Sequence, residues 1–290
     1  MTTASPLITA EALVEQIGDP SLGIIDATWF APFLPNDVEA LAAFAQEHIP
    51  GSVFLDIDQV AETGTGFSHT VPSQNTFIEQ TAELGLGKHS RFIVYDRNRF
   101  YASARVWWLL RLMGLDDVLV LDGGLEAWRA AGGPTHSGTH KVERSSLRDS
   151  VAYDPGLLSK TIELELQLDT HSHQIVDARP SGRFDGTSPE PRAGLESGHI
   201  PGSVNLQASD LISANGKLKS VADLSDVFSN ARIDFRKPVI ASCGSGVAAA
   251  VILLAAAQLG HWRVSLYDGS WTEWASDPTR PIATRNGERA

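Results

Sequence analysis

Cysteine is scarce in this chain of 290 residues, which contains one cysteine and two methionines. A single cysteine excludes an intrachain disulfide and a zinc site built from cysteines, and it fits a reducing compartment. The longest apolar run, Val247–Leu259, is shorter than the roughly 20 residues that span a bilayer. The N-terminus lacks the basic and apolar regions of a secretory signal. We therefore expect a cytoplasmic protein that does not associate with a membrane.

Positive charge is also in short supply. Lys and Arg number 23 against 35 Asp and Glu, the formal net charge is −12, and there is no long block of Lys or Arg. This balance argues against nucleic acid or an anionic membrane as the main partner. An anionic substrate would have to be attracted by a few well-placed arginines against the overall negative charge. The proportions of hydrophobic residues (42%) and charged residues (20%) are those of a globular protein.

The chain contains an internal repeat. Three blocks occur twice in the same order: Ile24–Ala27 and Ile175–Ala178, His48–Val53 and His199–Val204, and Asp122–Trp128 and Asp268–Trp274. The period is far longer than one supersecondary unit, so the repeat is a duplicated domain and not a solenoid. His48 and His199 occupy equivalent positions, which indicates a structural role for both.

Short apolar runs alternate with helical patterns in each copy, which favours an α/β domain with a mainly parallel sheet. Between the copies, Gly132–Tyr153 has no hydrophobic period and is predicted to be a linker. We expect domains at residues 7–133 and 154–286, joined by a linker at 134–153. The predicted strands are Phe92–Tyr95, Val118–Leu121, Gln174–Val176, Val239–Ser242 and Val264–Tyr267, and the predicted helices are Ala102–Met113 and Ala248–Gln258.

Cys243 lies between a predicted strand and a glycine-containing loop that leads into a helix. Gly244 and Gly246 allow successive backbone N–H groups to turn inward and form an anion cradle at the positive end of that helix. A thiolate in such a cradle would act as a nucleophile near neutral pH. The carboxyl end of a parallel strand is also where α/β sheets bind ligands. The alternative is a small buried hydrophobic residue, as most free cysteines are, and position alone leaves both open.

Two other anion-binding loops can be excluded from the residues. A nucleotide-binding P-loop needs Ser or Thr after its lysine, and Lys88 is followed by His89. A cysteine phosphatase loop would need an arginine at position 249, which is Ala249.

The repeated blocks, the loop Cys243–Val247 and the segment Arg105–Trp108 together resemble tandem rhodanese-type sulfurtransferases over nearly the whole chain. The resemblance implies an α/β fold of two tandem rhodanese-like domains, each a mainly parallel sheet flanked by helices. The loop is similar to that of the 3-mercaptopyruvate sulfurtransferase branch. The thiosulfate branch has two basic residues where this chain has Gly244 and Ser245.

The resemblance also implies the reaction. Cys243 would take sulfur from 3-mercaptopyruvate as a persulfide, release pyruvate, and pass the sulfur to a thiol such as that of thioredoxin or to cyanide, without a cofactor. One alternative is a thiosulfate sulfurtransferase, which has the same fold and another donor. A second is a non-enzymatic sulfur-relay or binding module that receives sulfur from a protein partner.

Two arginines match the residues that bind the donor in this family. Arg183 and Arg192 would hold the carboxylate and keto oxygen of mercaptopyruvate, for which a planar, bidentate guanidinium is well suited. The presence of both arginines argues against the relay module, since a module that receives sulfur from a protein would not need residues that bind a keto acid. Arg179 is expected to fix the surrounding loop instead. The resemblance adds the loop residues Gly244, Gly246, Val247 and Ala248 to the substrate-binding set.

A second group matches residues that handle protons in this branch. Ser245, His69 and Asp58 would supply the proton that the pyruvate enolate must gain after sulfur transfer. The alternative for a loop histidine near an acidic residue is a plain surface position. Other histidines form no cluster with ligand spacing, so we expect no metal site.

The chain departs from the family pattern at two places. Ala248 stands where the family often has threonine, so a hydroxyl donor worth about 1–2 kcal/mol is missing if it is used. Asp96 stands in the first copy where the second has Cys243, and a carboxylate cannot accept sulfur as a persulfide. We therefore expect the first domain to be non-catalytic.

Overall fold

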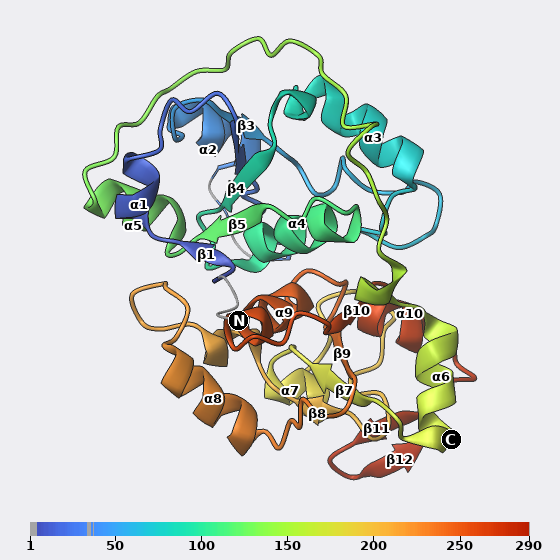
Figure 1. The fold of residues 1–290 in the computed structure, drawn as a ribbon. Helices are drawn as coiled ribbons and strands as arrows, with labels where there is room; N and C mark the ends of the chain where they lie inside the picture. The colour runs from blue at the N-terminus through green and yellow to red at the C-terminus, as the bar shows by residue number, and fades with distance from the viewer. Residues whose placement is uncertain (1–4, 34–35, 37, 290) are drawn as a thin grey trace. The chain divides into compact units, whose positions relative to one another are not determined.

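The computed structural model describes residues 5–33, 36 and 38–289 and divides the chain into two compact units (Figure 1). Each unit includes one short segment from the other half of the sequence. The first unit runs to Thr63 and includes Val71–Asp154 and Ala214–Leu218, and the second comprises Gly64–Thr70, Pro155–Ser213 and the chain from Lys219.

The first unit is a parallel sheet of five strands in the order β1-β5-β4-β2-β3. In chain order its elements are β1 (Leu7–Ile8), α1 (Ala10–Val14), β2 (Leu22–Asp26), α2 (Ala40–Gln46), β3 (Ser52–Phe54), α3 (Gln74–Glu83), the 3₁₀ helix η1 (Leu86–Lys88), β4 (Arg91–Tyr95), α4 (Tyr101–Leu112), β5 (Val118–Leu121) and α5 (Gly124–Ala130).

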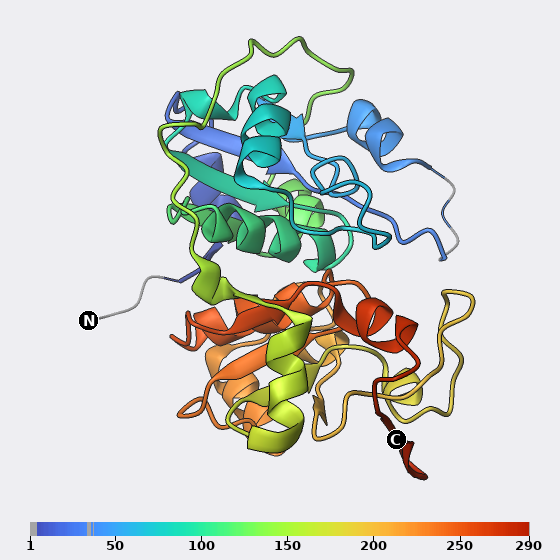
Figure 2. The same ribbon diagram turned by 90° about the vertical axis from the view of Figure 1, so that its right-hand side faces the viewer.

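The second unit repeats this topology with a parallel sheet in the order β6-β10-β9-β7-β8. An antiparallel hairpin, β11–β12, follows and projects from this unit (Figure 2). The elements are η2 (Pro155–Leu157), β6 (Leu158–Ser159), α6 (Thr161–Thr170), β7 (Gln174–Asp177), α7 (Ser181–Phe184), β8 (Val204–Asn205), η3 (Ala208–Leu211), α8 (Val221–Asn230), β9 (Val239–Ser242), α9 (Ala249–Gln258), β10 (Ser265–Tyr267), α10 (Ser270–Ser276), β11 (Ile282–Thr284) and β12 (Gly287–Arg289).

The matching strand orders confirm the duplication and the predicted parallel α/β architecture. Every strand residue of β9 is buried, as expected for a central strand that is covered on both faces. Helix α9 is buried from Ala249 to Ala257 because its sequence, rich in Ala and Leu, is apolar on all sides. It ends before Gly260, whose φ of 90° suits the left-handed position that follows a helix.

Corresponding side chains in the two cores make corresponding contacts. The indole Nε1 of Trp128 donates to the Pro134 carbonyl at 2.8 Å, and that of Trp274 donates to the Pro281 carbonyl at 2.9 Å. Both indoles are fully buried against one face of their sheet. Each turn histidine bonds through Nδ1 to the carbonyl of a phenylalanine on which it stacks, at 2.9 Å for His48 and 2.8 Å for His199. The predicted structural role of these histidines is confirmed.

Candidate active site

Strand β9 carries Cys243 to the carboxyl edge of the second sheet, just before the positive end of α9. The cysteine is unpaired and 2% exposed. Its carbonyl accepts from the Trp271 N–H at 2.9 Å, and the Gly244 carbonyl accepts from the Thr272 N–H at 3.0 Å. The first turn of α10 therefore fixes the backbone of the cysteine loop (Cys243–Ala248).

Ser270 is a site residue that the sequence reasoning missed. Its Oγ accepts from the Cys243 N–H at 3.1 Å, donates to the Tyr267 carbonyl at 2.8 Å, and lies 4.0 Å from Cys243 Sγ. The residue is fully buried and has a φ of 51°. A left-handed conformation costs a non-glycine residue about 1–3 kcal/mol and is enriched at active sites.

A signal for Ser270 was present in the third repeated block, where the first copy has Gly124. Gly124 has a φ of 57°, and a Cβ there would collide with the Asp96 carbonyl oxygen. The first unit thus requires glycine at this turn, whereas the second unit accommodates a serine whose hydroxyl faces the cysteine. The two units thus differ at this turn, and only the second places a hydroxyl beside its cysteine.

Arg192 lies beside the cysteine loop. Its Nη2 donates to Ser245 Oγ at 3.0 Å and lies 3.4 Å from Ser68 Oγ. A Cβ built on Gly244 would lie 3.5 Å from Arg192 Nη1. The structure thus brings together three residues that the sequence predicted for the site, Arg192, Gly244 and Ser245.

The other predicted residues of the substrate set lie on the same unit. Arg183 is on the short helix α7, and its carbonyl accepts from the Gly198 N–H at 3.0 Å. Gly246 has a φ of 77°, which its lack of a side chain permits, and Val247 and Ala248 lead into α9. Contacts of these residues with a substrate stay predictions.

The predicted proton-handling group is divided between the units. His69 is 5% exposed and follows Ser68 in the Gly64–Thr70 segment, which belongs to the same unit as Ser245. Asp58 belongs to the first unit, where its Oδ2 accepts from Trp29 Nε1 at 2.7 Å. The cooperation of Ser245, His69 and Asp58 stays a prediction.

In the first unit the loop that follows β4 corresponds to the cysteine loop, and the carboxylate of Asp96 binds the N–H groups of this loop. Its Oδ1 accepts from the N–H groups of Asn98 at 3.1 Å and Phe100 at 3.2 Å, and its Oδ2 accepts from the Ser103 N–H at 2.8 Å. Burial raises the pKa of Asp96, although these N–H donors act in the opposite direction. The equivalent of the cysteine loop is thus an anion cradle filled by the protein's own side chain.

Substitution of Asp96 by asparagine is expected to lower stability without loss of catalysis. An amide NH₂ directed at the N–H groups of the loop leaves at least one of them without an acceptor, which costs about 1–3 kcal/mol. Turnover per folded molecule should stay nearly unchanged, because the chemistry is assigned to Cys243. Denaturant unfolding and steady-state rates on the same preparations would check both. Lost turnover at unchanged stability would mean that the first unit takes part in catalysis.

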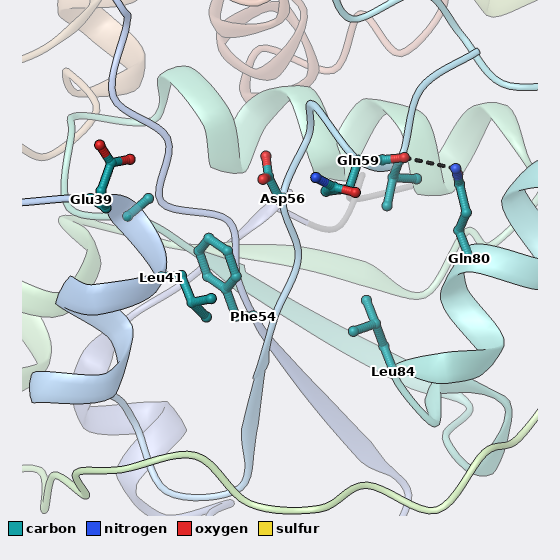
Figure 3. Close-up of a pocket in the computed structure, with 9 residues that line it drawn as sticks. Glu39, Leu41, Phe54, Asp56, Gln59, Gln80 and Leu84 are labelled. Carbon is teal, nitrogen blue, oxygen red and sulfur yellow. Dashed lines mark hydrogen bonds between the residues drawn. The ribbon is translucent and has the colours of Figure 1, made fainter. Parts of the chain in front are cut away.

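A cavity of about 480 Å³ on the first unit differs in character from the cysteine loop (Figure 3). Leu41, Phe54 and Leu84 give it an apolar surface, and Glu39 and Asp56 add carboxylates. Among the described residues that line it there is no thiol or guanidinium, so it does not suit sulfur transfer from an anionic donor.

The described residues contain neither a candidate metal site nor a candidate membrane span. No group of three or more His, Cys, Asp or Glu there is placed to hold a metal ion. None of the helices in the described part of the chain is long and apolar enough to cross a membrane.

Known proteins resemble this chain along most of its length. Human 3-mercaptopyruvate sulfurtransferase is 37% identical over 274 residues, which cover 92% of this chain and 91% of that protein. Mouse thiosulfate sulfurtransferase is 36% identical over 294 residues, with 97% of each covered. The crystal structure of SseA from Escherichia coli, described as a 3-mercaptopyruvate sulfotransferase, is 34% identical, with a TM-score of 0.83 and coverage of 92% of this chain and 99% of that one.

Overall identity does not separate the two sulfur donors named for these relatives, because 37% and 36% are nearly equal. The choice between the two donors has to be inferred from the residues of the cysteine loop. Residues 9–131 and 161–277 each match the model of the rhodanese-like domain. The chain belongs to the rhodanese-like family and carries two copies of its domain.

Proposed function

We propose that this protein is a 3-mercaptopyruvate sulfurtransferase that carries sulfur as a persulfide on Cys243. The observation that carries this proposal is the position of Arg192, which donates to Ser245 Oγ two residues after the cysteine. A guanidinium there can hold a carboxylate beside the nucleophile. Cys243 itself lies at the carboxyl end of β9, where sheets of this type bind ligands.

The first half of the cycle moves one sulfur atom. The Cys243 thiolate attacks the thiol sulfur of mercaptopyruvate, an S–S bond forms, and the C–S bond of the donor breaks. Its electron pair passes to the leaving carbon and gives the enolate of pyruvate, while the outer sulfur keeps its proton. Ser245 donates a proton to the enolate and regains one through His69 of the same unit. Pyruvate and the Cys243 persulfide result.

The second half regenerates the cysteine. The sulfur of a thiol acceptor, such as that of thioredoxin, or the carbon of cyanide attacks the outer sulfur, the S–S bond breaks, and Cys243 leaves as a thiolate. No cofactor takes part. Arg183 and Arg192 bind the donor, and the backbone from Gly244 to Ala248 surrounds the persulfide. Ala248 offers no hydroxyl to that persulfide, which lowers the rate and leaves the reaction unchanged.

Thiosulfate is the second candidate donor, and the likeness to mouse thiosulfate sulfurtransferase favours it. Thiosulfate is a dianion, so cations beside the cysteine would stabilise its binding. Gly244 and Ser245 provide none at these two positions. A keto acid instead presents one carboxylate and one ketone to Arg183 and Arg192.

Donor preference gives the test. We expect kcat/KM for mercaptopyruvate to exceed that for thiosulfate at least roughly tenfold, which corresponds to about 1.4 kcal/mol of transition-state preference. Steady-state rates with both donors and one acceptor would measure it, with the Cys243→Ser variant as the background. A higher kcat/KM for thiosulfate would overturn the assignment in favour of the second candidate.

A further inference from the structure

Arg179 is buried at the end of β7 and paired with Asp177. Its Nε donates to both carboxylate oxygens of Asp177, at 3.1 and 3.0 Å, and its Nη2 donates to Oδ2 at 2.6 Å. The side chains of Arg179 and Asp177 are 2% and 3% exposed. The guanidinium is therefore held rigidly at the carboxyl edge of the sheet.

The same guanidinium contacts the loop that carries Arg192 (residues 186–198, the arginine loop). Its Nη1 donates to Glu190 Oε1 at 2.8 Å, and its Nη2 donates to the Gly198 carbonyl at 2.6 Å. The Trp271 ring, on which Arg179 stacks at 4.3 Å, donates from Nε1 to the Glu196 carbonyl at 2.9 Å. The expectation that Arg179 fixes this loop is confirmed, and three separate points of the loop are involved.

Glu190 is the point nearest to Arg192. Its side chain is 2% exposed, although most of the loop around it is exposed. A carboxylate buried to this degree needs a charged partner, and Arg179 is that partner. Pro189 and Pro191 flank Glu190, and proline restricts the backbone both at itself and at the residue before it. A fixed Glu190 side chain consequently fixes the backbone that leads into Arg192.

Trp271 connects this arrangement to the nucleophile. Its backbone N–H donates to the Cys243 carbonyl at 2.9 Å, while its ring stacks on Arg179. One buried cluster of Arg179, Glu190 and Trp271 thus touches both the arginine loop and the cysteine loop.

We infer that Glu190 is a positioning residue, which through its ion pair with Arg179 holds Arg192 where the carboxylate of the sulfur donor binds. This inference rests on the proposed function, because it assigns Glu190 to the binding of the keto-acid donor. Glu190 itself touches neither the donor nor the cysteine. Its contribution is to the affinity for the donor and not to the transfer of sulfur.

Glu190→Ala and Glu190→Gln test the inference, with Glu165→Gln, in a more exposed ion pair of the same unit, as the control. Glu165 accepts from Arg280 Nε at 2.9 Å in the same unit, in an ion pair outside the arginine loop. We expect Glu190→Ala to raise KM for mercaptopyruvate about tenfold or more, and kcat to change less than about threefold. Glu190→Gln keeps an acceptor for Arg179 and should give a smaller rise, and Glu165→Gln should give none.

A double-mutant cycle separates positioning from general destabilisation. In an Arg192→Ala background, Glu190→Ala should raise KM no further, because the group that it positions is gone. Discharge of a preformed persulfide by cyanide should be unaffected in Glu190→Ala. Effects of Glu190 and Arg192 that multiply independently, or a loss confined to kcat, would overturn the inference.

A readout without a donor keeps this result distinct from that of the proposed function. Amide hydrogen exchange of residues 186–198 should become faster in Glu190→Ala and stay unchanged in Glu165→Gln. Unchanged exchange in Glu190→Ala would refute the anchoring of the loop, whichever donor the enzyme uses. Faster exchange in a protein that does not turn over mercaptopyruvate would refute the proposed function and the assigned donor, while the anchoring stood.

Discussion

Replacement of Cys243 by serine is expected to abolish sulfur transfer from either donor and to leave the fold intact. Serine matches cysteine in shape, and the hydrogen bonds of Cys243 are mainly through its backbone, so the core loses little. An alcohol oxygen cannot form a persulfide, and an unactivated hydroxyl is a weak nucleophile near neutral pH. Turnover should therefore fall to the rate of the uncatalysed reaction.

Circular dichroism and thermal unfolding, measured beside the rates, would show that the fold is kept. The chain has one cysteine, so a thiol reagent such as iodoacetamide reports on this residue alone. It should inactivate the parent protein and leave no label on Cys243→Ser. Turnover by Cys243→Ser above the uncatalysed rate would mean that another group carries the sulfur.

Joint replacement of Gly244 by arginine and Ser245 by lysine is expected to invert the donor preference. Gly244 lies where a Cβ would be 3.5 Å from Arg192 Nη1, and Ser245 Oγ accepts from Arg192 at 3.0 Å. Two cations there repel Arg192 and remove its acceptor, so the carboxylate clamp is displaced. A dianion is stabilised by the same charges. We expect kcat/KM for mercaptopyruvate to fall about 100-fold and that for thiosulfate to rise.

Replacement of the same two residues by glutamine is the matched control, because it adds comparable bulk without charge. This variant should lose activity with mercaptopyruvate and gain none with thiosulfate. Steady-state kinetics with both donors on the three proteins would decide. An equal gain with thiosulfate in the glutamine variant would show that bulk, and not charge, sets the choice of donor.

The central elements could be predicted from the sequence because they are buried apolar runs that end at turn residues. Predicted and observed bounds agree for Val239–Ser242 and Val118–Leu121, and differ by one residue for the helices. The edge strands β1, β6 and β8 have two residues each and are too short to show any alternation. Their pairing depends on neighbours that are distant in the sequence, so no local pattern could reveal them.

The residues of the site also differ in whether a local sequence pattern could reveal them. Cys243, Gly244 and Ser245 belong to one contiguous loop, and a motif could identify them together. Ser270 and Glu190 act through contacts with residues that are distant in the sequence. The left-handed backbone of Ser270 is imposed by the tertiary structure, since serine has no local preference for it. The burial of Glu190 depends on Arg179 and could not be inferred from a loop rich in glycine and proline.

The mass of the protein after treatment with mercaptopyruvate tests the central claim most directly. We predict a gain of one sulfur atom on the peptide that contains Cys243, together with one pyruvate released per protein molecule. Addition of cyanide should remove that sulfur and restore the original mass, and Cys243→Ser should gain none. Pyruvate release without a gain of sulfur at Cys243, or sulfur found on another residue, would contradict the persulfide account.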